Sequence, residues 1–341
     1  MKHPRTRSAP DIPDAFSGGG DIRTDKLVGL QKLAPQLPLR KQRKVLSTLA
    51  GTHVSRIRGR GIDFSEVRQY QPGDDIRAMD WRVTARTGHA HIKVFQEEKE
   101  RPILLVCDLR SGMRFGTRRV LKQVLAADLC ALFGWSALNE GDRIGALIFD
   151  DHQEIDLRPA TGAKQVLHLI QSLAATHSSP AMHSTPASEI SGSATAPGSA
   201  ATESPTQRLE AVCQHLRRIA RPGTSVYFIS DWQGWSEGAF RQLHQVTRHC
   251  DLTAIQVFDP MEAELPPPGL YDVTDGHQRA RLNTHSTTLR SAHRQAFEQF
   301  CQQLALDTTR LGVPLISIAT DQNPLTRLRD GMGIGRQRGK L

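Results

Sequence analysis

Long apolar runs are missing from this sequence of 341 residues. A helix that spans a membrane needs ~18 apolar residues in succession, and no stretch reaches that length. The charged N-terminal stretch is not followed by the apolar core of a secretory signal either. These two absences predict a cytoplasmic protein that is not membrane-spanning.

Cysteines are few and give no sign of pairing. The five stand far apart, mostly beside apolar residues, at Cys107, Cys130, Cys213, Cys250 and Cys301. An odd number with such spacing is typical neither of a disulfide framework nor of a zinc site, so we expect reduced and buried thiols. A nucleophile elbow, a Walker motif and a zinc-protease helix motif are absent as well, which argues against several common enzyme classes.

Aromatic residues are scarce, at 5% of the chain, and the positive charge is unevenly placed. Residues 1–61 hold 13 Lys or Arg against 4 Asp or Glu, a local excess of +9 that equals the formal charge of the whole chain. A basic segment attracts nucleic acid, anionic membranes and acidic proteins alike. With few aromatic side chains for base stacking, nucleic-acid binding is disfavoured, and a solvated basic arm is the simpler interpretation.

Composition and patterning divide the chain into parts. Segments rich in Pro, Gly, Ser, Thr and Ala bury too little apolar surface to fold by themselves. The predicted parts are a disordered basic arm at 1–25, a small N-terminal helix and β-rich region at 26–100, an α/β domain at 101–320 with a flexible insertion at 176–206, and a basic tail at 321–341.

Strand-like apolar runs alternate with helical stretches throughout the α/β domain. This alternation predicts a doubly wound, mainly parallel sheet covered by helices on both faces. The expected strands are 102–108, 143–150, 152–157, 224–231, 251–259 and 313–320, and the expected helices are 117–139, 163–173, 207–220, 236–249 and 288–306.

Two of the expected strands end in an aspartate, Asp108 after ILLVC and Asp231 after VYFIS. Parallel strands place their carboxyl ends at one edge of the sheet, where ligands of such folds bind. Two carboxylates at that edge suit a divalent cation.

The stretch from residue 61 to 116, with QPGDDIR, MDW and TARTG followed by an apolar strand ending in Asp, resembles the signature of the domain-of-unknown-function-58 family. The resemblance covers roughly residues 25–320. It implies a von Willebrand factor A-like domain in the second half of the chain. It also implies an interaction or adaptor protein, often linked to MoxR-type AAA+ ATPases, without enzymatic activity.

Metal-binding von Willebrand factor A domains use Asp-x-Ser-x-Ser after the first strand, a Thr from a second loop and an Asp from a third. Carried over to this chain, the resemblance matches Asp108, Thr161 and Asp231, whereas Arg110 and Gly112 replace the two serines. A degenerate Mg²⁺ site is one interpretation. The other is a metal-free loop in which Arg110 neutralises Asp108 or Asp231 through charge-assisted contacts.

The leading hypothesis is a non-catalytic adaptor whose contact surfaces include Arg110 and Ser111 at the strand ends. A second candidate surface is the charged segment QPGDDIRAMDWR, with the candidate residues Asp74, Asp75, Arg77, Asp80 and Trp81. The favoured interpretation of this segment is a structural clasp between the small region and the α/β domain. Two alternatives remain open: a Mg²⁺-dependent hydrolase that uses Asp108 and Asp231, and a nucleic-acid-associated protein that uses the basic arm.

Overall fold

The computed structural model describes residues 12–39, 62–71, 76, 79–97, 102–178, 204–274 and 279–334. The chain divides into two compact units. The larger unit comprises residues 1–52 and 102–341, and the smaller comprises residues 53–101. Within the described residues, no helix has both the length and the apolar character needed to cross a membrane.

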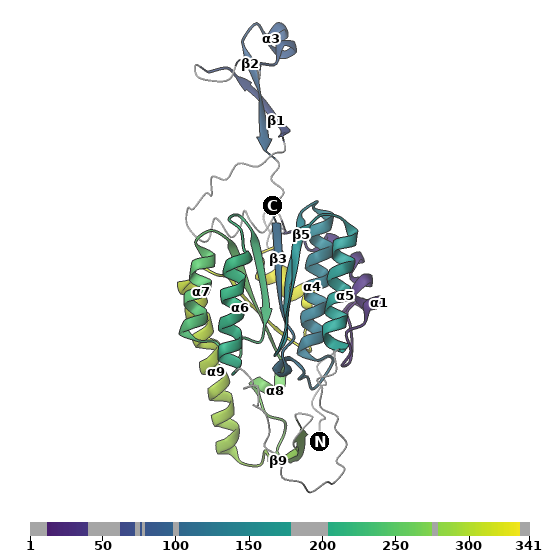
Figure 1. The fold of residues 1–341 in the computed structure, drawn as a ribbon, viewed down its shortest axis with the longest axis vertical. Coiled ribbons are helices and arrows are strands. Elements are labelled where there is room, and N and C mark those ends of the chain that lie inside the picture. Colours follow the sequence, from purple (N-terminus) through teal and green to yellow (C-terminus); the bar gives the residue numbers. More distant parts are fainter. Residues whose placement is uncertain are drawn as a thin grey trace, which may run out of the picture. The chain divides into compact units, whose positions relative to one another are not determined.

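The larger unit contains a six-stranded sheet in the order β10-β7-β6-β3-β4-β5 (Figure 1). Every neighbouring pair is parallel except β4 and β5, which are antiparallel. This confirms the predicted α/β class with a mainly parallel sheet. The strands are β3 (Pro102–Asp108), β4 (Arg143–Phe149), β5 (Glu154–Ala160), β6 (Ser225–Ser230), β7 (Asp251–Phe258) and β10 (Leu315–Ala319).

Burial explains why the central strands read as continuous apolar runs. Every residue of β6 is buried, and so is every residue of β3 after Pro102. Helices cover both faces of the sheet, so a central strand has no face in water and alternation between polar and apolar residues is lost. The edge strand β5 has only one buried residue, Leu157, which accounts for its charged sequence.

Helices form one layer on each face of the sheet (Figure 1). On one face α4 and α5 pack against Ile103, Leu105 and Cys107, and on the other α6, α7 and α9 pack against Leu104 and Val106. The helices are α4 (Lys122–Asn139), α5 (Ala163–Ser178), α6 (Pro205–Ile219), α7 (Glu237–Thr247), α8 (Pro260–Ala263), α9 (Thr287–Arg310) and α10 (Pro324–Gly331).

The segment before the sheet is part of the α4 and α5 face, which corrects two predicted boundaries. Phe16 and Ile22 are buried, so the prediction of a disordered arm does not hold for residues 12–25, and residues 1–11 lie outside the described part. Residues 26–39, predicted to belong to the small N-terminal region, pack on α4 instead. The helical elements of this segment are α1 (Thr24–Gly29), η1 (Leu30–Lys32) and η2 (Ala34–Gln36).

The reason for this correction is a polar contact that composition does not reveal. The buried Asp128 carboxylate on α4 accepts hydrogen bonds from the Ser17 backbone N–H at 2.9 Å and from the Ser17 hydroxyl at 2.6 Å. Trp135 on α4 donates its indole N–H to the Leu27 carbonyl at 2.9 Å. Contacts of this kind order a segment rich in Gly and Pro, because they satisfy its backbone groups.

The C-terminal boundary also differs from the prediction. Residues 321–334 were expected in a basic tail, but α10 buries Leu325 and Leu328 against the same face, and Met332 follows them into that core. Residues 335–341 lie outside the described part. Residues 179–203, which make up most of the insertion predicted at 176–206, also lie outside the described part of the chain.

A two-stranded antiparallel sheet of β8 (Leu270–Thr274) and β9 (Arg279–Asn283) precedes α9 and was not predicted. The smaller unit holds an antiparallel pair, β1 (Ile62–Gln69) and β2 (His91–Glu97), inside the region predicted to be β-rich. Between them lies α3 (Trp81–Thr87), which was not predicted.

Candidate functional site

The aspartates that end β3 and β6 lie at the point where the strand order of the sheet reverses. When the six strands are counted along the chain, from β3 as the first to β10 as the sixth, their order across the sheet is 3-2-1-4-5-6. The first strand, β3, therefore lies next to the fourth, β6. Connections leave these two strands in opposite directions, and in open α/β sheets ligands bind outside the carboxyl ends of the strands at such a point. Asp108 ends β3, and Asp231 directly follows β6 at this position.

Arg110 occupies the space beside both carboxylates. Its Nη2 lies 2.6 Å from Asp108 Oδ2 and 3.6 Å from Asp231 Oδ1. Its Nε donates to both oxygens of Asp108, and its backbone N–H donates to Asp108 Oδ1 at 3.0 Å. The Arg110 side chain is only 6% exposed, so this is a desolvated ion pair.

The remaining donors of Arg110 connect the β3 end to neighbouring loops. Nη1 donates to the carbonyls of Pro205 and Gln233, each at 3.1 Å, and the guanidinium carbon lies 5.6 Å from the centre of the Phe149 ring. Gly234 allows Pro205 to approach, because a Cβ at this glycine would lie 2.5 Å from the Pro205 backbone. One arginine thus joins the ends of β3 and β6 to the start of α6.

The β6 end is held in a strained conformation. Ser230 donates its hydroxyl proton to Asp108 Oδ2 at 2.6 Å and accepts the backbone N–H of Trp232 at 2.9 Å. Trp232 has φ 62°, in the left-handed region that bulky residues rarely occupy. Its side chain is fully buried, which fixes the backbone there. Strain of this kind concentrates at functional sites.

Lys122, the first residue of α4, neutralises the second aspartate. Its Nζ lies 2.8 Å from Asp231 Oδ2 and 2.7 Å from Glu262 Oε1 of α8. Asp231 Oδ1 accepts the backbone N–H of Gln233 at 3.0 Å. The Lys122 side chain is 1% exposed, so this ion pair too is removed from water.

The two cations remain charged in this environment. Burial lowers the pKa of Arg110 and Lys122, but the surrounding carboxylates outweigh it and raise both pKa values above their ordinary range. Burial raises the pKa of Asp108, and the Arg110 guanidinium opposes that rise. For Asp108 the effect of burial is the larger, so its pKa stays above the ordinary value, whereas Arg110 and Lys122 keep their charge in a site removed from water.

A magnesium ion does not fit this arrangement. Mg²⁺ requires near-octahedral oxygen ligands at about 2.0–2.1 Å. Both oxygens of Asp108 accept hydrogen bonds from Arg110, and those of Asp231 accept from Lys122 and Gln233. The guanidinium, which donates but cannot ligate, stands between the carboxylates. Among the described residues, no group of three or more His, Cys, Asp or Glu side chains could hold a metal ion.

Thr161 does not join this site. It follows β5, whose last residue, Ala160, pairs with Ile144 near the beginning of β4. Because β5 is antiparallel, Thr161 lies at the opposite edge of the sheet from Asp108. The resemblance placed Thr161 in the second loop of the metal motif, and the direction of β5 corrects that assignment.

Ser111, the other strand-end candidate, is exposed beside the site. Its backbone N–H donates to Asp151 Oδ2 at 2.8 Å, and its hydroxyl lies 3.3 Å from Asp151 Oδ1. Asp151 follows β4, so this contact joins the loops that follow two adjacent parallel strands. Ser111 therefore belongs to the outer rim and is not a ligand of Asp108 or Asp231.

Two of the five candidates in the charged segment are described. Asp80 caps α3 and accepts the backbone N–H groups of Arg82 and Val83 at 3.1 and 3.2 Å. Trp81 follows it and is 68% exposed. Asp74, Asp75 and Arg77 lie outside the described residues, so the docking surface and the clasp both stay predictions.

Sequence reasoning missed Lys122, Ser230 and Glu262. One signal was available for Lys122: a cation in the first turn of a helix opposes the helix dipole, and most residues of this helix are apolar. Such a lysine indicates a nearby carboxylate. The positions of Ser230 and Glu262 depend on tertiary contacts, which no local pattern reveals.

Three similar curated proteins are uncharacterized proteins of Mycobacterium bovis and of two strains of Mycobacterium tuberculosis, each 29% identical over 326 residues, which cover 94% of this chain and 93% of the relative. A solved structure, that of the conserved hypothetical protein BatB from Bacteroides thetaiotaomicron, aligns with a TM-score of 0.39 and 14% identity, covering 69% of this chain and 97% of that one. The family model "Protein of unknown function DUF58" matches residues 66–303. The chain therefore belongs to the DUF58 family.

Proposed function

We propose that this protein is a non-catalytic interaction module that presents the carboxyl edge of its sheet to a protein partner without the help of a metal ion. One observation carries the proposal. Arg110 and Lys122 neutralise Asp108 and Asp231 at the switch point of the sheet, where a ligand would otherwise be bound. A site whose charges are already compensated, and whose loops are tied together, is suited to presenting a fixed surface.

In this proposal the larger unit is a von Willebrand factor A-like domain with a replaced metal site. The aspartates at the ends of β3 and β6 and the reversal of strand order between them support this assignment. Arg110 and Gly112 stand where the motif has its serines. The guanidinium of Arg110 then supplies the positive charge that a metal would bring.

The partner that we propose is a MoxR-type AAA+ ATPase, in which ATP turnover takes place. This step rests on the family resemblance, since DUF58 proteins are often linked to such ATPases. The module itself would bind and orient a loop of the ATPase or of its client.

The contact surface proposed is the β3–α4 loop, residues 109–121, on the rim of the site. Phe115 is 39% exposed, and Ser111 and Arg114 beside it are exposed too. The loop's own backbone is fixed, because Thr117 donates to Asp259 from both its N–H and its hydroxyl. An exposed aromatic flanked by an arginine on a rigid loop has the composition of an interface hot spot.

Affinity capture of the tagged protein from its native lysate, with ATP and Mg²⁺, tests the proposal. The variant Phe115→Ser/Arg114→Ser removes the anchor while leaving the buried ion pairs intact. Leu167→Ser on α5 is the matched control, because Leu167 is 40% exposed and lies in the first half of α5, the helix that follows β5 at the opposite end of the sheet from Asp108. We expect wild type and the control to capture an AAA+ ATPase, and we expect the Phe115→Ser/Arg114→Ser variant to capture none. Equal capture by all three proteins would contradict the proposed surface, and no ATPase in any capture would contradict the proposed partner.

The alternatives gain no support from the site. A Mg²⁺-dependent hydrolase needs carboxylate oxygens open to a metal, and those of Asp108 and Asp231 already accept hydrogen bonds from cations. Of the basic segment at 1–61, only residues 12–39 are described, so nucleic-acid binding stays a prediction.

A further inference from the structure

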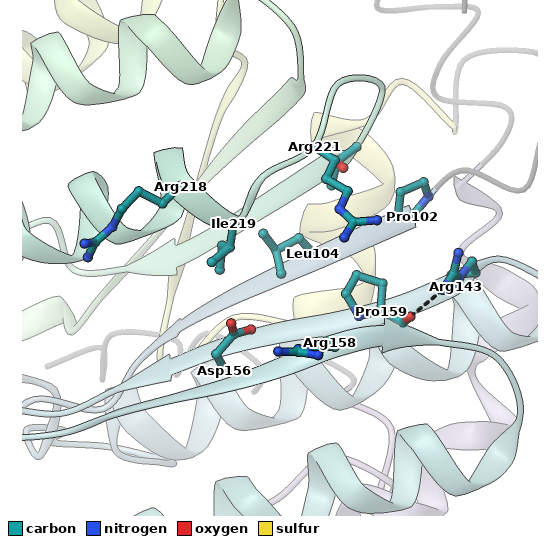
Figure 2. A pocket seen from close by; sticks show the side chains of 10 residues that line it. Pro102, Leu104, Arg143, Asp156, Arg158, Pro159, Arg218, Ile219 and Arg221 are labelled. Carbon is teal, nitrogen blue, oxygen red and sulfur yellow. Dashed lines mark hydrogen bonds between the residues drawn. The ribbon is translucent and has the colours of Figure 1, made fainter. Parts of the chain in front are cut away.

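A cavity of about 600 Å³ lies at the amino ends of β3, β4 and β6, at the opposite edge of the sheet from Asp108 (Figure 2). It is bounded by Pro102 and Arg143 at the starts of two strands, by β5, and by the end of α6. Pockets that hold small molecules span about 300–1,000 Å³, so this one has the size of a ligand site.

Four arginines line the cavity, each from a different part of the fold: Arg143 from β4, Arg158 from β5, Arg218 from α6 and Arg221 from the turn after α6. One carboxylate, that of Asp156, also lines it, which leaves a formal charge of +3. Within the described part of the chain none of the four forms an ion pair. Among the described residues, their guanidinium groups donate one hydrogen bond, from Arg143 Nη2 to the Pro159 carbonyl at 2.9 Å.

Local structure accounts for one of these arginines but not for the group. Arg218 lies in the last turn of α6, where a cation is favoured by the helix dipole. Arg143 and Arg158 are on strands and Arg221 is in a turn, so the dipole does not explain them. Four arginines and a single carboxylate around one cavity give it a net positive charge, which a bound anion would neutralise.

The wall between the arginines is apolar. Figure 2 shows Leu104 and Ile219 beside Pro102 and Pro159, with the side chains of Arg158 and Arg221 around them. Arginine binds phosphate through two parallel hydrogen bonds, and an apolar wall suits a ring or chain attached to that phosphate. We propose that this cavity binds a phosphate-bearing small molecule of about nucleotide size that carries an apolar or aromatic part.

Calorimetric titration of the full-length protein with ATP, in metal-free buffer, tests the proposal. We expect saturable binding of one ATP per chain. In Arg158→Gln/Arg221→Gln the dissociation constant should rise at least about tenfold, because each lost charge-assisted hydrogen bond weakens binding. Both side chains are exposed, so the variant is expected to fold, and an unchanged melting temperature would verify this.

Arg241→Gln/Arg329→Gln is the matched control, because it removes the same charge from exposed positions on α7 and α10 that do not line the cavity. It should keep the wild-type affinity within about twofold. Inorganic triphosphate should bind several-fold more weakly than ATP, because it cannot contact the apolar wall. Absence of saturable ATP binding, or equal weakening in both double variants, would overturn the proposal, and equal affinity for triphosphate would overturn the role of the apolar wall.

Discussion

Lys122 Nζ lies 2.8 Å from Asp231 Oδ2, and both side chains are almost completely buried. The two residues are 109 positions apart in the chain, and they meet because α4 begins at the edge of the sheet where β6 ends. Together with the Arg110 and Asp108 pair, this contact makes the centre of the site a set of compensated charges.

Removing Arg110 alone should destabilise the larger unit. Arg110→Met leaves the buried Asp108 carboxylate without its cation, and breaking a buried pair from one side costs about 3–5 kcal/mol. Asp108→Asn/Arg110→Met removes both charges and should cost less than Arg110→Met alone. Urea denaturation followed by circular dichroism measures both. A double variant less stable than the single one would contradict the assignment of a compensated pair.

Lys122 should matter more to stability than its second partner does. Lys122→Met leaves the buried Asp231 without its cation, and we expect the free energy of unfolding to fall by about 3–5 kcal/mol. Glu262 is 23% exposed, and Glu262→Gln keeps one acceptor oxygen where the carboxylate has two, one for Lys122 and one for the Asp259 backbone N–H, so it should cost about 1–2 kcal/mol. Thermal and urea unfolding of the two variants compares these effects. Equal losses would show that Glu262, and not Asp231, is the main partner of Lys122.

The apolar strands of the large sheet could be predicted from sequence because burial on both faces leaves a local pattern. The apolar runs at 102–108 and 224–231 identified β3 and β6. They also identified Asp108 and Asp231, which Arg110 contacts. The pairing of Arg110 with Asp108 was also open to prediction, since the two residues are only two positions apart. These features require no knowledge of tertiary contacts.

What the sequence could not predict depends on strand direction and distant partners. Thr161 was misplaced because nothing in a short charged strand tells whether it is parallel, and β5 is antiparallel. Residues 12–25 were expected to be disordered because their composition is polar, yet Ser17 meets Asp128 across 111 positions. Lys122 likewise lies at the site because of tertiary packing, since its partner Asp231 is 109 positions away in the chain.

Asp128 should give the protein a measurable pH dependence. Burial raises its pKa from 3.8 to about 6, partly opposed by the hydrogen bonds from Ser17. The folded state therefore binds a proton that the unfolded state releases between these values. The contribution of Asp128 to stability is largest below about pH 4, and up to about 3 kcal/mol of it is lost as the pH rises to 6.

Asp128→Asn isolates this effect, because it keeps one acceptor for Ser17 and cannot titrate. Urea unfolding at several pH values should show the stability of wild type falling, relative to the variant, between pH 4 and 6 and then staying level. A relative stability that rises over this interval would mean that Asp128 is ionised well below pH 6 in the folded protein.

If the proposed replaced metal site is correct, introducing the two serines of the von Willebrand factor A motif should create a metal site. In Arg110→Ser/Gly112→Ser the guanidinium is gone and two hydroxyls replace it. A Cβ at Gly112 would lie 3.5 Å from Asp231 Oδ2, an ordinary contact, and φ at this position does not require glycine, so serine fits. We expect the variant to bind Mn²⁺ or Mg²⁺, which calorimetry would detect. A variant that folds as wild type does but binds neither metal would contradict the interpretation of this loop as a replaced metal site.

The most direct test is a titration of wild-type protein with Mn²⁺, followed by electron paramagnetic resonance, with the Arg110→Ser/Gly112→Ser variant alongside. Since Arg110 and Lys122 occupy the oxygens of Asp108 and Asp231, wild type should leave the spectrum of free Mn²⁺ unchanged. Stoichiometric binding of Mn²⁺ by wild type, abolished by Asp231→Asn, would contradict the claim that these two cations take the place of a metal ion.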